Sequence, residues 1–460
     1  MTVRMRTLLP IVLAFIVSAC GQAYAASVAQ PGVAAVAPAA AASAAPASLE
    51  WPVYHLNAQR TGYQTDFPTL TGSLTQAWAK SLDGAVYAEP LVVHGHVIVA
   101  TENDSIYELD AHTGAVLWQR NLGTPVPLST LPCGNINPLG ITGTPAYDPT
   151  TNTLLAVAEV TGPAHILFAL NPSTGVVRWS RNVDLAGDDP TTHQQRTALA
   201  VANGYVYFGF GGLAGDCGQY KGEVLGVPTT GTGATIFYRV PVAREGAVWA
   251  TGGPVVNTKG DLFVSVGNGS SRTTYDGSDS VIELYPSLKL LSRFAPSTWA
   301  ADNASDHDLG SMSPVLVPGG WVLIAGKSGT AYTLRQGKLG GIGGQVSSLQ
   351  LCTGFGGASQ IGTTIFVPCS GDIAAVHVRT DGSIKSLWVT TSGAGEPPVV
   401  GGGAVWSVSL ASGRLFALDP ATGATIQSIS VGPVPHFVSP TLYNGLVFVG
   451  TLAGVVAIRA

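Results

Sequence analysis

The chain has 460 residues, of which 11% are charged, and its formal net charge at pH 7 is −5. Average soluble domains carry about 25% charged residues, so the surface of this protein is expected to be unusually neutral. The small net charge and the lack of a stripe of Lys and Arg argue against nucleic acid as a partner. The 58 glycines and 30 prolines follow no three-residue period, which excludes collagen and indicates frequent turns between short strands.

Residues 1–19 have the pattern of a signal peptide, with a basic start and an apolar core too short to span a bilayer as a mature helix. The following Val17-Ser18-Ala19-Cys20-Gly21 resembles the lipobox of bacterial lipoproteins, which predicts a lipid on Cys20. The alternative is cleavage by the ordinary signal peptidase after Ala25, which would release a soluble protein without Cys20. Both alternatives place the mature chain outside the cytoplasm.

Residues 20–50 consist mostly of Ala, Pro, Ser and Val, and this composition predicts a disordered tether. The rest of the chain, residues 51–460, is expected to form one domain. No stretch of it has a sustained 3.6-residue period, so no helix is expected there. Residues 74–82, which include Trp78, predict an isolated strand at the start of this domain.

Three segments within the domain repeat one another, at residues 108–118, 169–179 and 417–427. Each predicts a strand, a tight turn and a second strand. Gly114, Gly175 and Gly423 allow a left-handed backbone in the turns, and Trp118 and Trp179 return to a sheet as large packing anchors. Weaker copies with another aromatic residue lie at 226–237 and 283–294.

A proline or a small residue opens an alternating, β-rich run at eight places: Pro90, Pro145, Leu199, Pro254, Pro314, Ala358, Pro397 and Pro440. Three strands after each opening and one Trp-type strand make a four-stranded blade. We therefore expect an all-β fold, an eight-bladed propeller of four-stranded antiparallel blades. The strand at 74–82 is expected to pair with the last, incomplete blade, because this closes the ring and removes free edge strands.

The cysteines indicate disulfides. Without Cys20 the chain has four, which we pair as Cys133–Cys217 and Cys352–Cys369, since an oxidising compartment permits both bonds. The alternative is that the thiols are free and buried. No adjacent cysteines and no Cys-x-x-Cys motif occur, so neither a redox dithiol nor a covalent haem is indicated.

The Trp-containing turns resemble the tryptophan-docking motif of pyrroloquinoline-quinone (PQQ) propellers, and residues 51–63 are similar to the segment that starts many such domains. This resemblance implies a relation to two groups. One comprises non-catalytic lipoproteins similar to the Bam-complex scaffold, which assists outer-membrane protein assembly. The other comprises the PQQ-dependent alcohol dehydrogenases, which hold the quinone between a Trp and a disulfide of adjacent cysteines and bind Ca²⁺ through acidic and amide ligands. This sequence lacks the adjacent cysteines.

In a propeller, the loops that enter the innermost strands meet at one mouth of the central channel. The candidate ligand-binding residues just before the eight openings include Glu89, Arg196, Trp249, Glu396 and His436. Glu89, Arg196 and Glu396 either pair inside the channel, where they would clamp a polar ligand, or remain solvated.

The most metal-like pair in the sequence is Asp306 and Asp308, which offers hard oxygens to Ca²⁺. Two ligands do not make a site, and the alternative is that both residues cap turns near Gly310.

Together these features favour a non-catalytic, exported lipoprotein that acts as a protein-interaction or ligand-binding scaffold at the cell envelope. Its expected partner is another envelope or secreted protein, or an extended peptide. We expect a monomer without a cofactor, which touches the membrane only through its lipid.

Two other functions remain open. One is a PQQ- and Ca²⁺-dependent dehydrogenase of alcohols or sugars that uses the channel mouth. The other is a lectin-like glycan binder that uses aromatic residues such as Tyr220, Tyr275 and Trp321.

Overall fold

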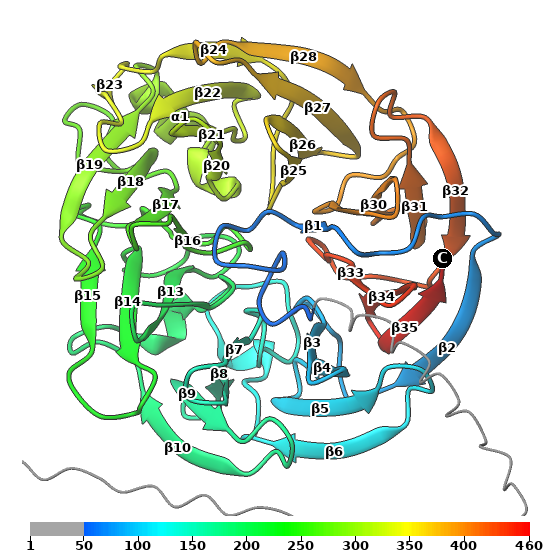
Figure 1. Cartoon of the computed structure of the whole chain (residues 1–460). Coiled ribbons are helices and arrows are strands. Elements are labelled where there is room, and N and C mark those ends of the chain that lie inside the picture. Colours follow the sequence, from blue (N-terminus) through cyan, green and yellow to red (C-terminus); the bar gives the residue numbers. More distant parts are fainter. Residues whose placement is uncertain (1–49) are drawn as a thin grey trace, which may run out of the picture. The chain divides into compact units, whose positions relative to one another are not determined.

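The computed structural model describes residues 50–460 (Figure 1). The predicted signal peptide, the lipidation of Cys20 and the tether up to residue 49 lie outside these residues. The described part forms eight β-sheets arranged as a ring, each a four-stranded antiparallel blade, and three of them gain one extra short strand. The predicted eight-bladed propeller is therefore confirmed. Within residues 50–460, no helix is long and apolar enough to cross a membrane.

The blades follow one another along the chain, and in each the strands run from the innermost to the outermost position. The first blade consists of β3 (Leu91–Val93), β4 (His96–Ala100), β5 (Ser105–Asp110) and β6 (Val116–Asn121), and the second of β7 (Ala146–Asp148), β8 (Thr153–Val160), β9 (Ala164–Leu170) and β10 (Val177–Asn182). The third blade consists of β12 (Ala200–Ala202), β13 (Tyr205–Gly212), β14 (Glu223–Pro228) and β15 (Ile236–Arg239), with β11 (His193–Gln194) added. The fourth blade consists of β16 (Val255–Val256), β17 (Leu262–Val266), β18 (Ser280–Leu284) and β19 (Leu290–Ala295), with β23 (Gly341–Ile342) added.

The other four blades repeat this order. The fifth blade consists of β20 (Val315–Val317), β21 (Trp321–Ile324), β22 (Thr330–Arg335) and β24 (Ser347–Gln350), and the sixth of β25 (Ser359–Ile361), β26 (Thr364–Cys369), β27 (Asp372–Val378) and β28 (Ile384–Val389). The seventh blade consists of β29 (Val399–Gly401), β30 (Ala404–Ser409), β31 (Arg414–Leu418) and β32 (Thr425–Ser430), with β1 (Tyr63–Gln64) added. The eighth blade consists of β33 (Thr441–Tyr443), β34 (Leu446–Thr451), β35 (Gly454–Arg459) and β2 (Thr75–Ser81).

The last blade closes the ring as predicted. Strand β2, from the start of the domain, pairs antiparallel with β35 at its end, from Thr75 opposite Arg459 to Ser81 opposite Gly454. Figure 1 shows the blue and red strands side by side at this point. Because β2 supplies the fourth strand, β35 has a partner on each side, and neither edge of it is free to pair with another chain.

Tryptophans of the outermost strands dock against the turn of the following blade. The indole Nε1 atoms of Trp78, Trp118 and Trp388 donate to carbonyl oxygens in the next turn, at 3.0, 2.9 and 3.1 Å. Each ring lies against a glycine of positive φ in that turn, and these glycines are Gly114, Gly175 and Gly423. A side chain at any of them would collide with the indole. The repeated motif thus joins neighbouring blades.

The core lies between the blades, where the short inner strands are almost entirely buried. The expectation that the domain has no helix needs correction. A seven-residue helix, α1 (Trp299–Ser305), precedes the fifth blade, together with three short 3-10 turns: η1 (Leu128–Thr130), η2 (Pro190–Thr192) and η3 (Leu309–Ser311). The helix is too short to establish a period, and its buried residues, Asp302 and Asn303, are polar. The predicted disulfides Cys133–Cys217 and Cys352–Cys369 both form.

Candidate functional site

One end of the central channel is closed by the N-terminal residues 51–64, which we call the floor segment. Figure 1 shows this blue segment crossing the middle of the ring. Its carbonyl oxygens accept hydrogen bonds of 2.7–2.9 Å from backbone N–H groups of innermost strands, and β1 pairs with β29. Arg60 donates to the carbonyl of Leu199 at 2.8 Å. The strand residues that donate are Val92, Tyr147, Val256, Gln360 and Val400.

Glu89 lies in this floor and not at the open mouth, where the sequence had placed it. Its carboxylate accepts from the indole of Trp51 at 3.0 Å and from the backbone N–H of His55 at 2.9 Å. Burial raises the pKa of Glu89 well above its usual range, despite these bonds and the charge of Arg60. Glu89 therefore fixes the floor segment and is not among the residues that line the cavity described next.

The opposite end of the channel opens into a cavity of about 660 Å³. The loops before the innermost strands and the turns between the second and third strands of the blades surround it. Six residues predicted from the sequence meet here: Arg196, Trp249, Asp306, Asp308, Glu396 and His436. The other principal lining residues are Gln194, Asp216, Asn268, Lys327, Phe355, Ala411 and Phe437. The structure thus brings these six side chains together around one cavity.

A smaller void of about 10 Å³ lies between the cavity and the floor. It shares Arg196, His436 and Phe437 with the cavity, and it touches Tyr54 of the floor segment. Its volume is about that of one water-sized probe. The cavity is thus blind, since the floor segment closes the channel below it.

Lys327 forms ion pairs with both acidic residues that the sequence had suggested as metal ligands. Its ammonium lies 2.8 Å from Asp306 and 3.1 Å from Asp308, and it stands 5.6 Å from the centre of the Trp249 ring. Burial, partly offset by Lys327, raises the pKa of Asp308 to about 6. Asp308 retains one buried carboxylate oxygen without a hydrogen-bond partner. The pair is therefore an ion-paired wall of the cavity.

Arg196 also lines the cavity, and it forms no ion pair with any of residues 50–460. Its guanidinium lies 5.0 Å from the centre of the Phe437 ring and 5.9 Å from that of Tyr87. The alternatives for Glu89, Arg196 and Glu396 were pairing and solvation. All three side chains are buried, no ion pair joins them among residues 50–460, and Glu396 accepts from the backbone N–H of Phe437. Burial raises the pKa of Glu396 to about 7.

Lys327 and Phe437 were not among the residues predicted from the sequence. Lys327 follows β21 in a turn, and only the assembled ring shows that such turns face the mouth. Phe437 directly follows the predicted His436 and has a positive φ of 64°, an uncommon conformation for a non-glycine residue. Burial lowers the pKa of His436 to about 3, so its imidazole is neutral.

A disulfide-tied cover lies beside the cavity. The long connection between the first two blades, residues 122–145, meets the loop 213–222 through Cys133–Cys217. Ile136, Leu139 and Leu213 form a small apolar cluster around this bond. Asn135 and residues 213–216 carry the cover to the cavity rim.

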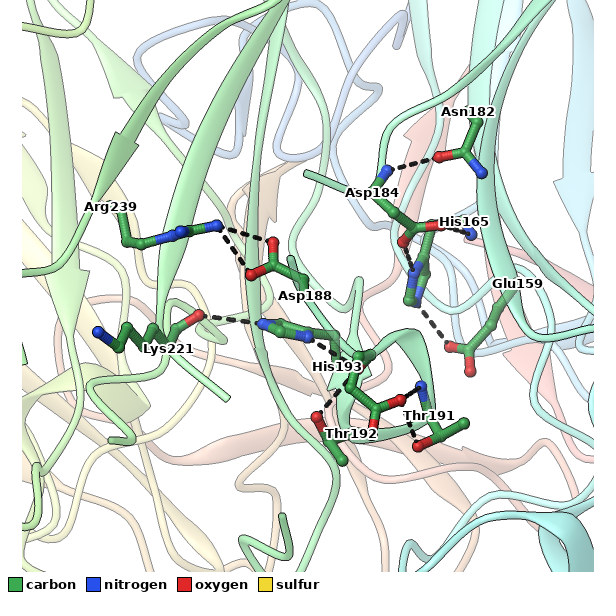
Figure 2. A network of polar contacts seen from close by, with 11 residues as sticks. Glu159, His165, Asn182, Asp184, Asp188, Thr191, Thr192, His193, Lys221 and Arg239 are labelled. Carbon is green, nitrogen blue, oxygen red and sulfur yellow. Dashed lines mark hydrogen bonds and ion pairs between the residues drawn. The ribbon is translucent and has the colours of Figure 1, made fainter. Parts of the chain in front are cut away.

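A second polar cluster lies at the third blade (Figure 2), and it includes His193, which precedes the cavity-lining Gln194 in the sequence. Asp188, His193 and Glu223 place possible ligand atoms within 4.8 Å of one another. Arg239 already bonds both carboxylates, with Asp188 at 2.8 and 2.9 Å. The guanidinium thus supplies the charge that a metal ion would supply.

The same figure shows His165 between two carboxylates, Asp184 at 2.7 Å and Glu159 at 3.1 Å. Burial alone would lower its pKa, but the two carboxylates raise the pKa of His165 to about 9. The imidazolium is therefore a buried structural ion that joins β8, β9 and the segment after β10.

Comparison with known proteins places this geometry in context. The sequence profile of the outer membrane protein assembly factor BamB matches residues 53–261. No curated protein matches the chain significantly.

Solved structures share the fold at low identity. Quinohemoprotein alcohol dehydrogenase from Comamonas testosteroni has a TM-score of 0.69 at 16% identity, over 89% of this chain and 80% of that one. A europium-containing methanol dehydrogenase has a TM-score of 0.68 at 14% identity, over 89% and 98% of the two chains. BamB from Moraxella catarrhalis has a TM-score of 0.59 at 16% identity, over 84% and 99%.

Proposed function

Because the chain is a PQQ-like β-propeller repeat protein similar to BamB over residues 53–261, we propose that it is an extracytoplasmic binding protein that holds a ligand in the channel-mouth cavity and carries out no reaction on it. Propellers of this kind occur as scaffolds and as enzymes, so the fold alone does not assign the activity. The proposal therefore depends on the site.

The observation that carries the proposal is the blind cavity of about 660 Å³. Pockets for small molecules commonly have volumes of about 300–1,000 Å³, mostly apolar walls and a few placed polar groups. Here Trp249, Phe355 and Phe437 supply aromatic walls, and Arg196 and Lys327 supply charge. A flat protein-docking face would not need such depth.

The residues of the cavity suit the quinone of a quinoprotein dehydrogenase but not its calcium ion. A flat, anionic ring system would find the Trp249 face and two cations. Calcium takes about six to eight oxygen ligands, and the proposed pair, Asp306 and Asp308, already shares the ammonium of Lys327. The quinone–calcium pair therefore does not fit this donor set, and we assign no redox step to the site.

The glycan-binding alternative loses its aromatic surface. Tyr220 is 1% exposed and Trp321 is 5% exposed, so neither ring is available to stack on a sugar. Tyr275 packs edge-on against Trp299.

The location follows from the disulfides, which persist in oxidising compartments. We further propose that a lipid on Cys20 anchors the protein in the envelope, with the propeller presented to a ligand, a peptide or another envelope protein.

A pair of substitutions in one turn tests the proposal. Ala411 is exposed and lines the cavity, whereas the neighbouring Ser412 is exposed but does not line it. Ligands found by thermal shift in a panel of neutral, cationic and anionic compounds should lose binding in Ala411→Trp and keep it in Ser412→Trp. Calcium-dependent binding of PQQ with alcohol- or sugar-dependent dye reduction would contradict the proposal.

A further inference from the structure

We propose that the ligand carries a carboxylate, that Arg196 binds this group, and that the aromatic walls hold a flat or apolar body next to it. This inference rests on the proposed function, because it names the chemistry of the ligand that the cavity takes.

Arg196 is the first part of the argument. It is 7% exposed, and it makes no hydrogen bond or ion pair with any of residues 50–460, although its Nε atom is fully enclosed. A buried charge without a hydrogen-bond partner is costly, and most buried polar groups in proteins are hydrogen-bonded. The side chain lines both the cavity and the small void beneath it. A ligand group in the cavity would complete its hydrogen bonding.

The other cation of the cavity does not offer the same site. The ammonium of Lys327 already bonds two carboxylates, Asp306 and Asp308. An incoming anion would meet the negative charge of that pair. Arg196 thus attracts an anion where Lys327 does not.

Two acidic residues near Arg196 favour a ligand group with a single negative charge over one with two. Glu396 accepts from the N–H of Phe437, and Glu102 accepts from the N–H of Gly140 at 2.8 Å and from Thr142 at 3.1 Å. Both carboxylates act on Arg196 through space without bonding it. In their ionised forms they would repel a doubly charged phosphate more than a singly charged carboxylate, and a carboxylate matches the planar fork of a guanidinium.

The walls define the rest of the ligand. Phe437 lies 5.7 Å from Phe355 and 6.0 Å from Trp249, measured between ring centres. Phe437 also stacks on the guanidinium, which holds the fork in place. An aromatic or apolar body beside the carboxylate would cover these rings. Both a free aromatic acid and the C-terminus of a peptide that ends in an apolar residue have this chemistry.

The test uses the full protein and matched probes. Dissociation constants are measured by calorimetry for 1-naphthoate, for the neutral 1-naphthamide, for naphthyl phosphate, and for a Phe-ending tripeptide with a free or an amidated C-terminus. Naphthoate should bind, and naphthamide and naphthyl phosphate should bind at least tenfold more weakly. The tripeptide arm distinguishes a peptide source, for which the free C-terminus binds more tightly than naphthoate, from a small-acid source, for which it binds more weakly.

Variants assign the effect to the guanidinium. A hydrogen bond to a charged group contributes about 1.5–3 kcal/mol, so Arg196→Gln should weaken naphthoate binding about 10- to 100-fold. Arg196→Lys keeps the charge but loses the planar fork, so its affinity for naphthoate should lie between that of the wild type and that of Arg196→Gln. Arg178→Gln, outside the cavity, is the control, and melting curves verify that each variant folds.

Three results would overturn the inference: no carboxylate binds, naphthamide binds as tightly as naphthoate, or Arg196→Gln leaves the affinity unchanged. If neutral ligands bind and Ala411→Trp removes their binding, this inference fails while the proposed function stands. If Ala411→Trp affects no ligand, the proposed function fails as well.

Discussion

Gly114 has a positive φ of 69°, and a Cβ atom added to it would lie 2.6 Å from the ring of Trp78. Gly204 has a similar φ of 77°, but nothing lies within 4 Å of an added Cβ. Alanine substitutions at these two glycines therefore distinguish the free-energy cost of a left-handed backbone from the cost of a collision with Trp78. A left-handed backbone costs a non-glycine residue about 1–2 kcal/mol, and overpacking costs about 1–3 kcal/mol more.

We expect Gly204→Ala to lower the free energy of unfolding by about 1–2 kcal/mol and Gly114→Ala to lower it by about 2–5 kcal/mol. Urea denaturation measures both. Equal losses for the two variants would show that the indole does not need the space above Gly114.

Asp104 is a second residue whose effect can be measured, because it should make the stability of the protein depend on pH. Its side chain is fully buried and neither carboxylate oxygen has a hydrogen-bond partner. Burial, helped by the charges of Glu102 and Glu159, raises the pKa of Asp104 to about 8. The folded protein therefore retains a proton that the unfolded chain loses above about pH 4. The contribution of this group to stability falls as pH rises from about 4 to 8.

Asp104→Asn removes this ionisation. Relative to the wild type, the variant should gain stability steadily between pH 5 and pH 8.5, as measured by urea denaturation at several pH values. A difference between variant and wild type that stays constant with pH would mean that Asp104 does not hold the proton.

Residue types at the mouth could be predicted because each stands just before a strand opening, as Arg196 and Trp249 do. Their partners could not. Glu89 also stands just before its strand, but its carboxylate bonds Trp51 and His55 of the floor segment. The sequence does not reveal that this segment crosses the ring and contacts blades that are far from it along the chain. Hydrogen bonds across the ring decide such roles, and spacing along one chain does not reveal them.

At the scale of elements, the two disulfides differ in what they constrain. Cys133–Cys217 joins residues 84 apart and ties the cover, whereas Cys352–Cys369 joins residues 17 apart. In the chain-entropy account, closing the longer loop stabilises by about 4–5 kcal/mol and the shorter by about 3 kcal/mol. The cover should also become looser without its bond.

Replacing both Cys133 and Cys217 by Ala should therefore lower the melting temperature more than replacing Cys352 and Cys369. Differential scanning calorimetry compares the two double variants. A larger loss for the Cys352 and Cys369 variant would contradict this ranking.

The strands were predictable since alternation, turn glycines and the Trp motif agree at each blade. The helix α1 and the role of the floor segment were not. The helix is too short for periodicity, and the floor segment has little regular structure except β1, because its hydrogen bonds go to several different blades.

At the scale of the whole molecule, the ring depends on one pairing, β2 with β35. Trp78 in β2 is 9% exposed and donates to Ala111 in the first blade, so this strand joins the first and last blades. Loss of a buried Trp alone costs about 3–5 kcal/mol, and an unpaired β35 would present a free edge.

Replacing residues 75–81 by a Gly/Ser linker of equal length should thus lower stability by at least about 3–5 kcal/mol and produce oligomers on size-exclusion chromatography. A monomer of unchanged stability would show that the ring does not need this strand.

The central claim is that the blind mouth of this propeller holds a small ligand. The most direct measurement is a native mass spectrum of the protein purified gently from the cells that produce it, as wild type, Ala411→Trp and Ser412→Trp. We predict an added ligand mass on the wild type and on Ser412→Trp, and none on Ala411→Trp. A wild-type protein without any added mass, or a mass that Ala411→Trp retains, would contradict the account.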